Sequence, residues 1–98
     1  MELNLNNIIG FQWDSGNDTK SFAKHAVTCE EAQEIFMNSP LISKDEGHSD
    51  KENRWRALGE TDGKRLLHAT FTIRGNLIRI ISARPMHRKE RLIYEKHH

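Results

Sequence analysis

The arginines in the last third of the chain are the residues whose types and spacing most clearly suggest chemistry. Arg79 and Arg84 lie within the most apolar segment of the chain, residues 77–84, and Arg88 and Arg91 follow in a basic segment. Burying a guanidinium group without an anionic partner is unfavourable, so we expect these arginines to have one. Guanidinium groups match phosphate oxygens in pairs and stay charged at any useful pH. The pattern therefore indicates phosphate as the counterpart.

The alternation of side chains along a strand decides which arginines can meet. Arg54 and Arg56 are two residues apart and should share one face of their strand. Arg79 and Arg84 have opposite parity, so they converge only if the strand bulges or ends before Arg84. The following Pro85 favours such an end. A second possibility is that the arginines pair with carboxylates of the chain, for which Glu52, Glu90 and Glu95 are available. This alternative is favoured most for Arg56 and Arg74.

The pair Lys24-His25 could supply proton transfer. A histidine can take or give a proton near neutral pH, and a neighbouring lysine can stabilise an anionic intermediate. RNA cleavage needs a base for the 2′-hydroxyl proton, cations for the charged phosphorane, and an acid for the leaving 5′-oxygen. The pair alone is a weak signal, since a histidine near a helix end is often a capping or packing residue.

Metal and thiol chemistry find little support in the sequence. His25, His48, His68 and His87 show no ligand spacing, so we expect no metal site and no cofactor. The single cysteine, Cys29, excludes an internal disulfide framework and suits a reducing compartment, so we expect a cytoplasmic protein. A packing role for Cys29 is the favoured interpretation. No apolar run approaches the about 20 residues that a membrane span needs.

Charge is unevenly distributed along the chain. From Arg74 onward there are seven Lys and Arg against two Glu, whereas the preceding residues hold eight basic against twelve acidic side chains. A basic end beside an acidic body suggests an anionic partner for the C-terminal third, although a solvated basic helix would look the same. With 98 residues, the chain 1–98 is expected to form one domain.

The elements that must position these residues follow from hydrophobic periodicity. Two early helices are predicted, one beginning at Asp14 or Ser15 and ending near Ala26, and one capped by Thr28 with Glu31. The strands and the last helix are expected at 8–13, 41–43, 54–59, 65–73, 77–84 and 86–96. Ile9, Phe11 and Trp13 should share one face of the first strand, and the aromatic residues follow core periodicity. The fold class is α+β, with helices packed on an antiparallel sheet.

Several blocks of residues together resemble one known family. The blocks are Phe11-x-Trp13-Asp14, Lys20, Lys24-His25-x-Val27-x-x-Glu30-Glu31-Ala32, Glu52-x-Arg54-x-x-x-x-Gly59, Ile78-Arg79-Ile80-Ile81-Ser82-Ala83-Arg84 and Arg88-x-Glu90-Arg91-x-x-Tyr94. In order and spacing, from Ile8 to Glu95, they resemble the BrnT family of type II toxin–antitoxin toxins. The chain departs from the family at Ala26, where glycine is usual, at Cys29, where an aromatic residue is common, and at Ser21-Phe22, where an asparagine is expected.

The resemblance implies a fold, an activity and partners. The fold would be a small RelE-like domain with about four antiparallel strands, two N-terminal helices and one C-terminal helix. The activity would be metal-independent endoribonuclease cleavage that inhibits translation. The partner would be a BrnA-type ribbon-helix-helix antitoxin, in a heterotetramer of two toxins and two antitoxins. Operator DNA would be bound only through the antitoxin, and no membrane would be involved.

The resemblance also implies the residues of the site. The RNA-cutting surface would hold Lys24, His25, Arg54, Arg79 and Arg84. Close to it the RNA would contact Arg88, Glu90, Arg91 and Tyr94, with Tyr94 as a base-stacking or hydroxyl-bonding residue. Glu90 is expected to orient Arg54 or Arg79, or to act as an alternative base.

Two other functions are compatible with the sequence. A catalytically weak or inactive homologue could act as an antitoxin-binding module in an autorepressor complex, without turnover. Direct DNA binding through the basic C-terminal helix is the third interpretation, and arginines inside strands argue against it because they would face a pocket rather than a groove.

Overall fold

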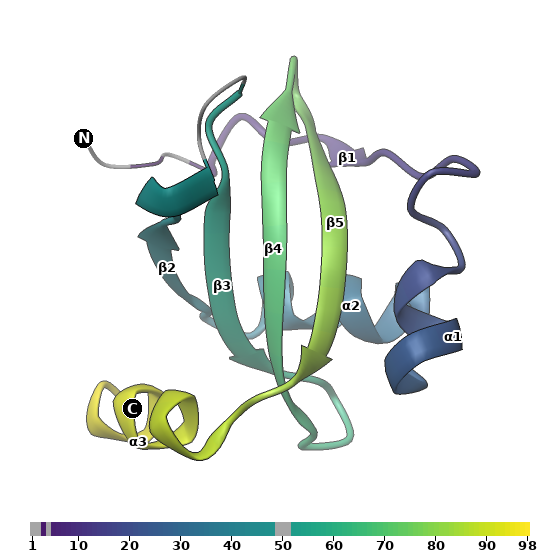
Figure 1. Cartoon of the computed structure of the whole chain (residues 1–98). Coiled ribbons are helices and arrows are strands. Elements are labelled where there is room, and N and C mark those ends of the chain that lie inside the picture. The colour runs from purple at the N-terminus through teal and green to yellow at the C-terminus, as the bar shows by residue number, and fades with distance from the viewer. Residues whose placement is uncertain (1–2, 4, 49–51) are drawn as a thin grey trace.

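The computed structural model of the chain contains one five-stranded sheet with the order β1-β5-β4-β3-β2. It describes residues 3, 5–48 and 52–98. The strands are β1 (Gly10–Phe11), β2 (Leu41–Lys44), β3 (Trp55–Glu60), β4 (Leu66–Arg74) and β5 (Leu77–Pro85). The helices are α1 (Lys20–His25), α2 (Cys29–Met37) and α3 (Arg88–Lys96), with a short 3₁₀ helix η1 (Glu46–His48). Figure 1 shows the three long strands at the centre of the molecule.

The helices lie in three different places around the sheet. Helix α2 packs against β3 and β4 on one face, whereas α1 lies along β5. Helix α3 contacts β3 at the end of the opposite face, where Tyr94 packs with Leu58, and Figure 1 shows it below the lower ends of β2 and β3. The α+β class is therefore confirmed, with the helices distributed so that one sheet face stays largely uncovered.

The main core lies between α2 and the sheet. Alternation sends Trp55, Ala57 and Gly59 of β3 toward α2, where Ala32 and Ile35 are buried. A Cβ atom at Gly59 would lie 2.9 Å from Cβ of Ile35, so this position has room only for glycine. The capping box predicted for α2 is confirmed: the Thr28 hydroxyl accepts from the Glu31 N–H at 3.0 Å, and the Glu31 carboxylate accepts from the Thr28 N–H at 3.2 Å.

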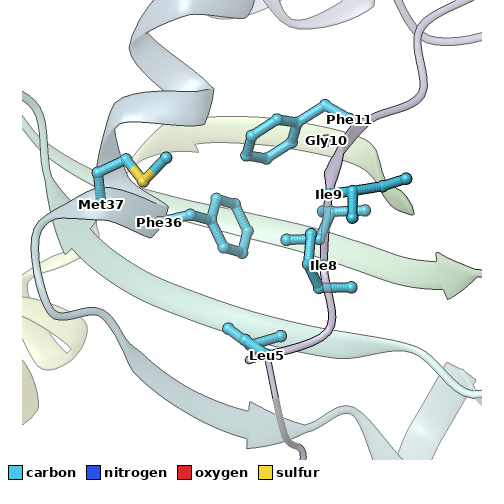
Figure 2. A pocket seen from close by; sticks show the side chains of 8 residues that line it. Leu5, Ile8, Ile9, Gly10, Phe11, Phe36 and Met37 are labelled. Carbon is cyan, nitrogen blue, oxygen red and sulfur yellow. The ribbon is translucent and has the colours of Figure 1, made fainter. Parts of the chain in front are cut away.

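Aromatic rings connect the N-terminal segment to this core. Phe36 of α2 packs edge-to-face against Phe71 of β4, with centroids 5.0 Å apart, and against Phe11 at 5.7 Å. Figure 2 shows Phe11 and Phe36 turned toward one another beside a hollow of about 220 Å³ that Leu5 and Ile8 also line. The first segment of the chain is thus fixed by its contacts with α2 as well as by β1.

The structure corrects the predicted sheet in two respects. It has five strands rather than about four, and β1 pairs in parallel with β5, whereas the remaining pairs are antiparallel. The first strand is also shorter than 8–13, and Ile9 is 79% exposed instead of facing inward with Phe11. Propensity identifies a strand but not its partner, and β1 joins the edge of a strand that lies far along the chain.

The start of the first helix was also predicted wrongly. Asp14 does not cap a helix; its carboxylate accepts from the Gly16 N–H at 2.8 Å within a turn. The Asn17 amide of the same turn donates to the Ile80 carbonyl at 2.8 Å. These bonds fix the turn against β5 and delay α1 until Lys20. Polar residues such as Asp and Asn serve turns as readily as helix caps, which explains the error.

Ala26 ends α1 in the left-handed conformation, with φ 54°. Because this region is strained for alanine, we expect Ala26→Gly to raise the free energy of unfolding by roughly 0.5–1 kcal/mol, after allowing for the greater freedom of glycine in the unfolded chain. The matched control is Ala23→Gly within the same helix, which should lower the free energy of unfolding by about the same amount. Urea unfolding measures both; an unchanged or reduced stability for Ala26→Gly would contradict the argument.

Candidate functional site

The sheet face turned away from α2 is polar over much of its area, and we call it the open face. On β3 and β4 the alternation that sends Ala57 and Ala69 inward turns Arg56 and His68 to this face. At its lower end α3 covers a small second cluster, in which Leu58, Met86 and Tyr94 are buried. Among the described residues, no other α-helix covers the rest of this face (Figure 1).

A β-bulge brings Arg79 and Arg84 to this face together. Thr70 pairs with Ser82, but the next residue of β4, Phe71, pairs with Ile80, so β5 contains one extra residue. In a regular strand Arg79 and Arg84 would lie on opposite sides. The extra residue shifts the alternation by one, so both side chains lie on the same face. Of the two ways in which these arginines could converge, the structure shows the bulge; β5 continues through Arg84 and ends at Pro85.

Arg79 is held by Asp14 from the turn after β1. Its Nη1 donates to Oδ2 at 2.7 Å and its Nη2 to Oδ1 at 3.1 Å, a two-bond fork. The side chain of Arg79 is only 13% exposed, whereas that of Asp14 is 51% exposed. The hydrogen bonds from Arg79 hold the pKa of the Asp14 carboxyl below its ordinary value. Arg79 is therefore a fixed, charged group whose partner is accessible to solvent.

Arg84 forms a second fork with Glu90 at the start of α3. Nη1 and Nη2 donate to the two carboxylate oxygens at 2.8 and 3.0 Å, and the same carboxylate accepts from the His87 N–H at 2.8 Å. His68, the cross-strand neighbour of Arg84, places Nε2 3.7 Å from Oε2 of Glu90. Arg84 thus pairs with Glu90, as the carboxylate alternative predicted, and the prediction that Glu90 orients Arg54 or Arg79 was wrong.

Protonation states in this group follow from burial and charge. Burial alone would raise the pKa of Glu90, but hydrogen bonds from Arg84 and from the His87 N–H lower it to about 2. Burial, reinforced by the Arg84 charge, lowers the pKa of His68 below its ordinary value. At neutral pH the group therefore contains an ionised Glu90 beside a neutral imidazole, and Glu90 is too weak a base to take a proton readily.

The Glu90 fork should appear in the acid stability of the protein. A folded pKa of about 2 against an ordinary 4.5 stabilises the fold above pH 4.5, and this contribution is lost as the pH falls toward 2. We expect Glu90→Gln to lower the free energy of unfolding by up to about 3 kcal/mol at pH 7 and to flatten its decline below pH 4.5. Urea titrations across this range test the prediction.

The control for this measurement is Glu95→Gln. Glu95 is an exposed carboxylate of the same helix with no side-chain bond among the described residues. Its replacement should leave the stability at pH 7 within about 0.5 kcal/mol of the wild type. If the free energy of unfolding of Glu90→Gln declined below pH 4.5 as steeply as that of the wild type, the fork would not stabilise the fold.

Lys24 and His25 lie at the end of α1, beside β5. The Ser21 hydroxyl of α1 accepts from the Ala83 N–H at 2.7 Å, directly before Arg84, and Arg65 donates to the carbonyls of His25 and Ala26 at 3.0 and 2.9 Å. Helix α1 is thus fixed against β5 at Ala83, the residue before Arg84. The side chains of Lys24 and His25 make no hydrogen bond or ion pair with the described residues, so their catalytic roles stay predictions.

The other arginines behave differently from one another. Arg74 pairs with Glu52 at 3.1 Å at the far end of β4, as the carboxylate alternative predicted. Arg56 is exposed on the open face and has no ion pair within the described part of the chain, so that alternative was wrong for it. Arg54 immediately precedes β3 and is partly buried. Its backbone carbonyl accepts from the Asp45 N–H at 2.9 Å.

Helix α3 offers less to a ligand than predicted. Arg88 and Arg91 are exposed, and Arg91 donates to the Met86 carbonyl at 3.4 Å. Tyr94 is only 7% exposed because its ring packs with Leu58 and Met86. This burial, with the His98 ring 4.2 Å from the Tyr94 ring, corrects the expectation that Tyr94 stacks on a base, and its role as a hydroxyl-bonding residue stays a prediction. Phe22 was expected in the core with the other aromatic residues, but it is 59% exposed and lies outside the core.

Sequence reasoning missed Asp14 and His68 as members of this site. Asp14 was interpreted as a helix cap, although it lies next to Trp13 in one of the blocks that carry the family resemblance. His68 had a usable signal: His68, Thr70 and Thr72 alternate with apolar residues along β4, so all three had to share the face opposite the core.

The described residues offer little for thiol or metal chemistry. Burial raises the pKa of the Cys29 thiol, and its Sγ donates to the Asp18 carbonyl at 3.1 Å, as expected for a packing residue. Among the described residues, no three His, Cys, Asp or Glu side chains cluster as a metal site would need. Nor does any helix in those ranges have the length and apolarity to cross a membrane.

Comparison with known proteins places the chain in a family. Residues 13–90 match the family described as the ribonuclease toxin BrnT of type II toxin–antitoxin systems. The fold is similar to the 1.1 Å crystal structure of the Brucella abortus ribonuclease toxin BrnT, with a TM-score of 0.64 and 22% identity over 82% of this chain and 99% of that one. No curated protein matches the chain. Because the family match spans most of the sequence, including every residue of the two arginine forks, the chain belongs to the BrnT family of type II toxin–antitoxin ribonuclease toxins.

Proposed function

We propose that this chain is the active toxin of its system, a RelE-like endoribonuclease that cleaves RNA without a metal ion and thereby inhibits translation. The observation that carries the proposal is the placement of Arg79 and Arg84 on the same sheet face, each held in a fork by a carboxylate. Preorganised cations of this kind stabilise charge that develops in a transition state without having to reorganise during the reaction.

In the proposed reaction the 2′-oxygen of the RNA attacks the adjacent phosphorus and the 5′-oxygen leaves. A base takes the 2′-hydroxyl proton, an acid returns a proton to the leaving oxygen, and the products are a 2′,3′-cyclic phosphate and a 5′-hydroxyl. Arg79, Arg84 and Arg54 would hold the phosphorane, and Lys24 would add positive charge. His25 would act as acid or base.

The remaining predicted residues would bind RNA beyond the scissile phosphate. Arg88 and Arg91 lie exposed on α3 and could contact neighbouring phosphates. Glu90 would contribute through Arg84, since a carboxylate with a pKa of about 2 positions a cation better than it accepts a proton. Exposed carboxylates such as Asp14 would yield their arginine to the more highly charged phosphate.

A type II toxin implies an antitoxin partner. We propose a BrnA-type ribbon-helix-helix protein, joined in a heterotetramer of two toxins and two antitoxins that binds operator DNA through the antitoxin. An acidic or mixed antitoxin segment over the open face would exclude RNA by charge neutralisation and by sterics. The reducing compartment suggested by the lone cysteine is the cytoplasm.

Induction of the protein in growing cells tests the proposal. Wild-type protein should arrest growth, and Arg79→Ala should lose the arrest at equal expression because one transition-state cation is worth on the order of 100-fold in rate. Co-expression of the antitoxin should relieve the wild-type arrest. Full toxicity of Arg79→Ala would refute the arginine assignment.

The alternative, a module that binds antitoxin without turnover, predicts another pattern. Wild-type protein would then leave growth unaffected yet still co-purify with the antitoxin. Ala26 at the end of α1 is the observation that favours it, since strain next to His25 could displace the imidazole. Toxicity of Ala26→Gly together with a non-toxic wild type would support this alternative.

A further inference from the structure

A second feature of the open face lies beside the arginine forks. A hollow of about 250 Å³ opens between β2, β3, β4 and α3. Leu41, Leu58 and Ile93 form apolar walls, and the polar lining includes Ser43, Arg56 and His68. Its size falls below the about 300–1,000 Å³ of sites for drug-sized ligands, so it suits a small planar group rather than a larger molecule.

The polar lining is rich in hydrogen-bond donors. Ser43 and Arg56 are exposed cross-strand neighbours in the β2–β3 register, and Arg56 has no ion pair within the described residues. His68 is 8% exposed, and burial lowers its pKa, so it meets the hollow as a neutral imidazole. The Glu90 carboxylate also lines the hollow, but it is already engaged by Arg84 and the His87 N–H.

The hollow is also one strand away from Arg84. Register pairs His68 with Leu58 on one side and with Arg84 on the other. A group seated over Leu58 and His68 would therefore lie next to whatever phosphate Arg84 holds. Single-stranded RNA is recognised in this manner, with a splayed base placed against apolar or guanidinium surfaces while its edge receives hydrogen bonds.

We propose that this hollow binds one unpaired nucleobase of the RNA substrate, adjacent to the phosphate held by Arg84. The inference deepens the proposed function and rests on it. Donors from Ser43 and Arg56 would meet acceptor atoms on the base edge, and Leu58 and Ile93 would contact its faces. Cleavage should accordingly show a base preference at one position next to the cut.

Three variants separate this role from a structural one. Ser43→Phe places a ring in the mouth of the hollow at an exposed strand position where phenylalanine is favourable. Ile93→Ala removes a wall, and its matched control is Leu92→Ala, the neighbouring exposed residue that does not line the hollow. Arg56→Ala removes a donor without altering the core.

The first experiment sequences the ends produced from a randomised single-stranded RNA. Wild type and Leu92→Ala should share one preferred base beside the cut, whereas Ser43→Phe, Arg56→Ala and Ile93→Ala should reduce that preference by on the order of tenfold. Cleavage with an unchanged base preference in Ser43→Phe and Arg56→Ala, both still folded by circular dichroism, would overturn the inference while leaving the proposed function intact.

A second measurement does not require catalysis. Binding of 2′-O-methyl homopolymers, which lack the attacking hydroxyl, is compared between wild type and Ser43→Phe. Discrimination among bases by the wild type, lost in Ser43→Phe, supports the hollow as a base site even if no RNA is cut. Equal binding of all four homopolymers by both proteins would overturn it.

Discussion

Replacement of Arg84 by alanine is expected to slow RNA cleavage by about 100-fold and to abolish growth arrest. Arg84 presents a guanidinium group that Glu90 and the α3 terminus hold in one orientation. Its loss removes a fixed positive charge from the position where the phosphorane would develop. Arg84→Lys should recover only part of the rate, because an ammonium group cannot form the two parallel hydrogen bonds of a guanidinium fork. Initial rates on a single-stranded RNA measure both.

The matched control is Arg74→Ala. Arg74 is also an arginine of the sheet paired with a carboxylate, Glu52, but it lies at the far end of β4 and outside the site. The Arg74→Ala variant should cleave RNA at nearly the wild-type rate. Because Arg84→Ala leaves Glu90 without its main partner, its fold must be verified by unfolding titration. Equal rates for a folded Arg84→Ala and for Arg74→Ala would remove Arg84 from the mechanism.

The largest effect on stability is expected at Phe71. Phe71 is fully buried at the centre of the sheet, and its ring packs edge-to-face against Phe36 of α2. Phe71→Ala should lower the free energy of unfolding by about 3–5 kcal/mol, since the surrounding structure can only partly close the cavity. For a domain of this size, stabilised in total by about 5–15 kcal/mol, the variant would be marginally folded.

Phe22→Ala is the control for this change. The same side chain is removed, but Phe22 is 59% exposed on α1. Its free energy of unfolding should remain within about 0.5 kcal/mol of the wild type. Urea or thermal unfolding of the two variants side by side isolates burial as the cause. A loss below about 1 kcal/mol for Phe71→Ala would contradict the position of the core.

The sequence was sufficient for those features that local rules govern. The Thr28–Glu31 capping box, the three long strands and the end of the first helix near Ala26 all follow from neighbouring residues. Counting alternate residues also shows that Arg79 and Arg84 share a face only if the strand bulges or ends before Arg84. The location of the bulge at Ile81 does not follow in this way, because the bulge depends on pairing with β4.

Features set by distant parts of the chain could not be predicted in this way. The parallel pairing of β1 with β5, the fork from Asp14 to Arg79 and the placement of His68 beside Glu90 each join segments that sequence patterns treat separately. Glu90 shows the difference plainly. It was expected to orient an arginine, but only the geometry of α3 against β5 selects Arg84 over Arg79 and Arg54.

Cleavage by the purified protein in the presence of EDTA tests the central claim most directly. A single-stranded RNA is incubated with the wild type and with Arg84→Ala, and the ends of the products are identified by mass spectrometry. The proposed mechanism predicts EDTA-resistant cleavage that leaves a 2′,3′-cyclic phosphate and a 5′-hydroxyl, and that is about 100-fold slower in the variant. Cleavage abolished by EDTA, or products with a 5′-phosphate and a 3′-hydroxyl, would contradict it.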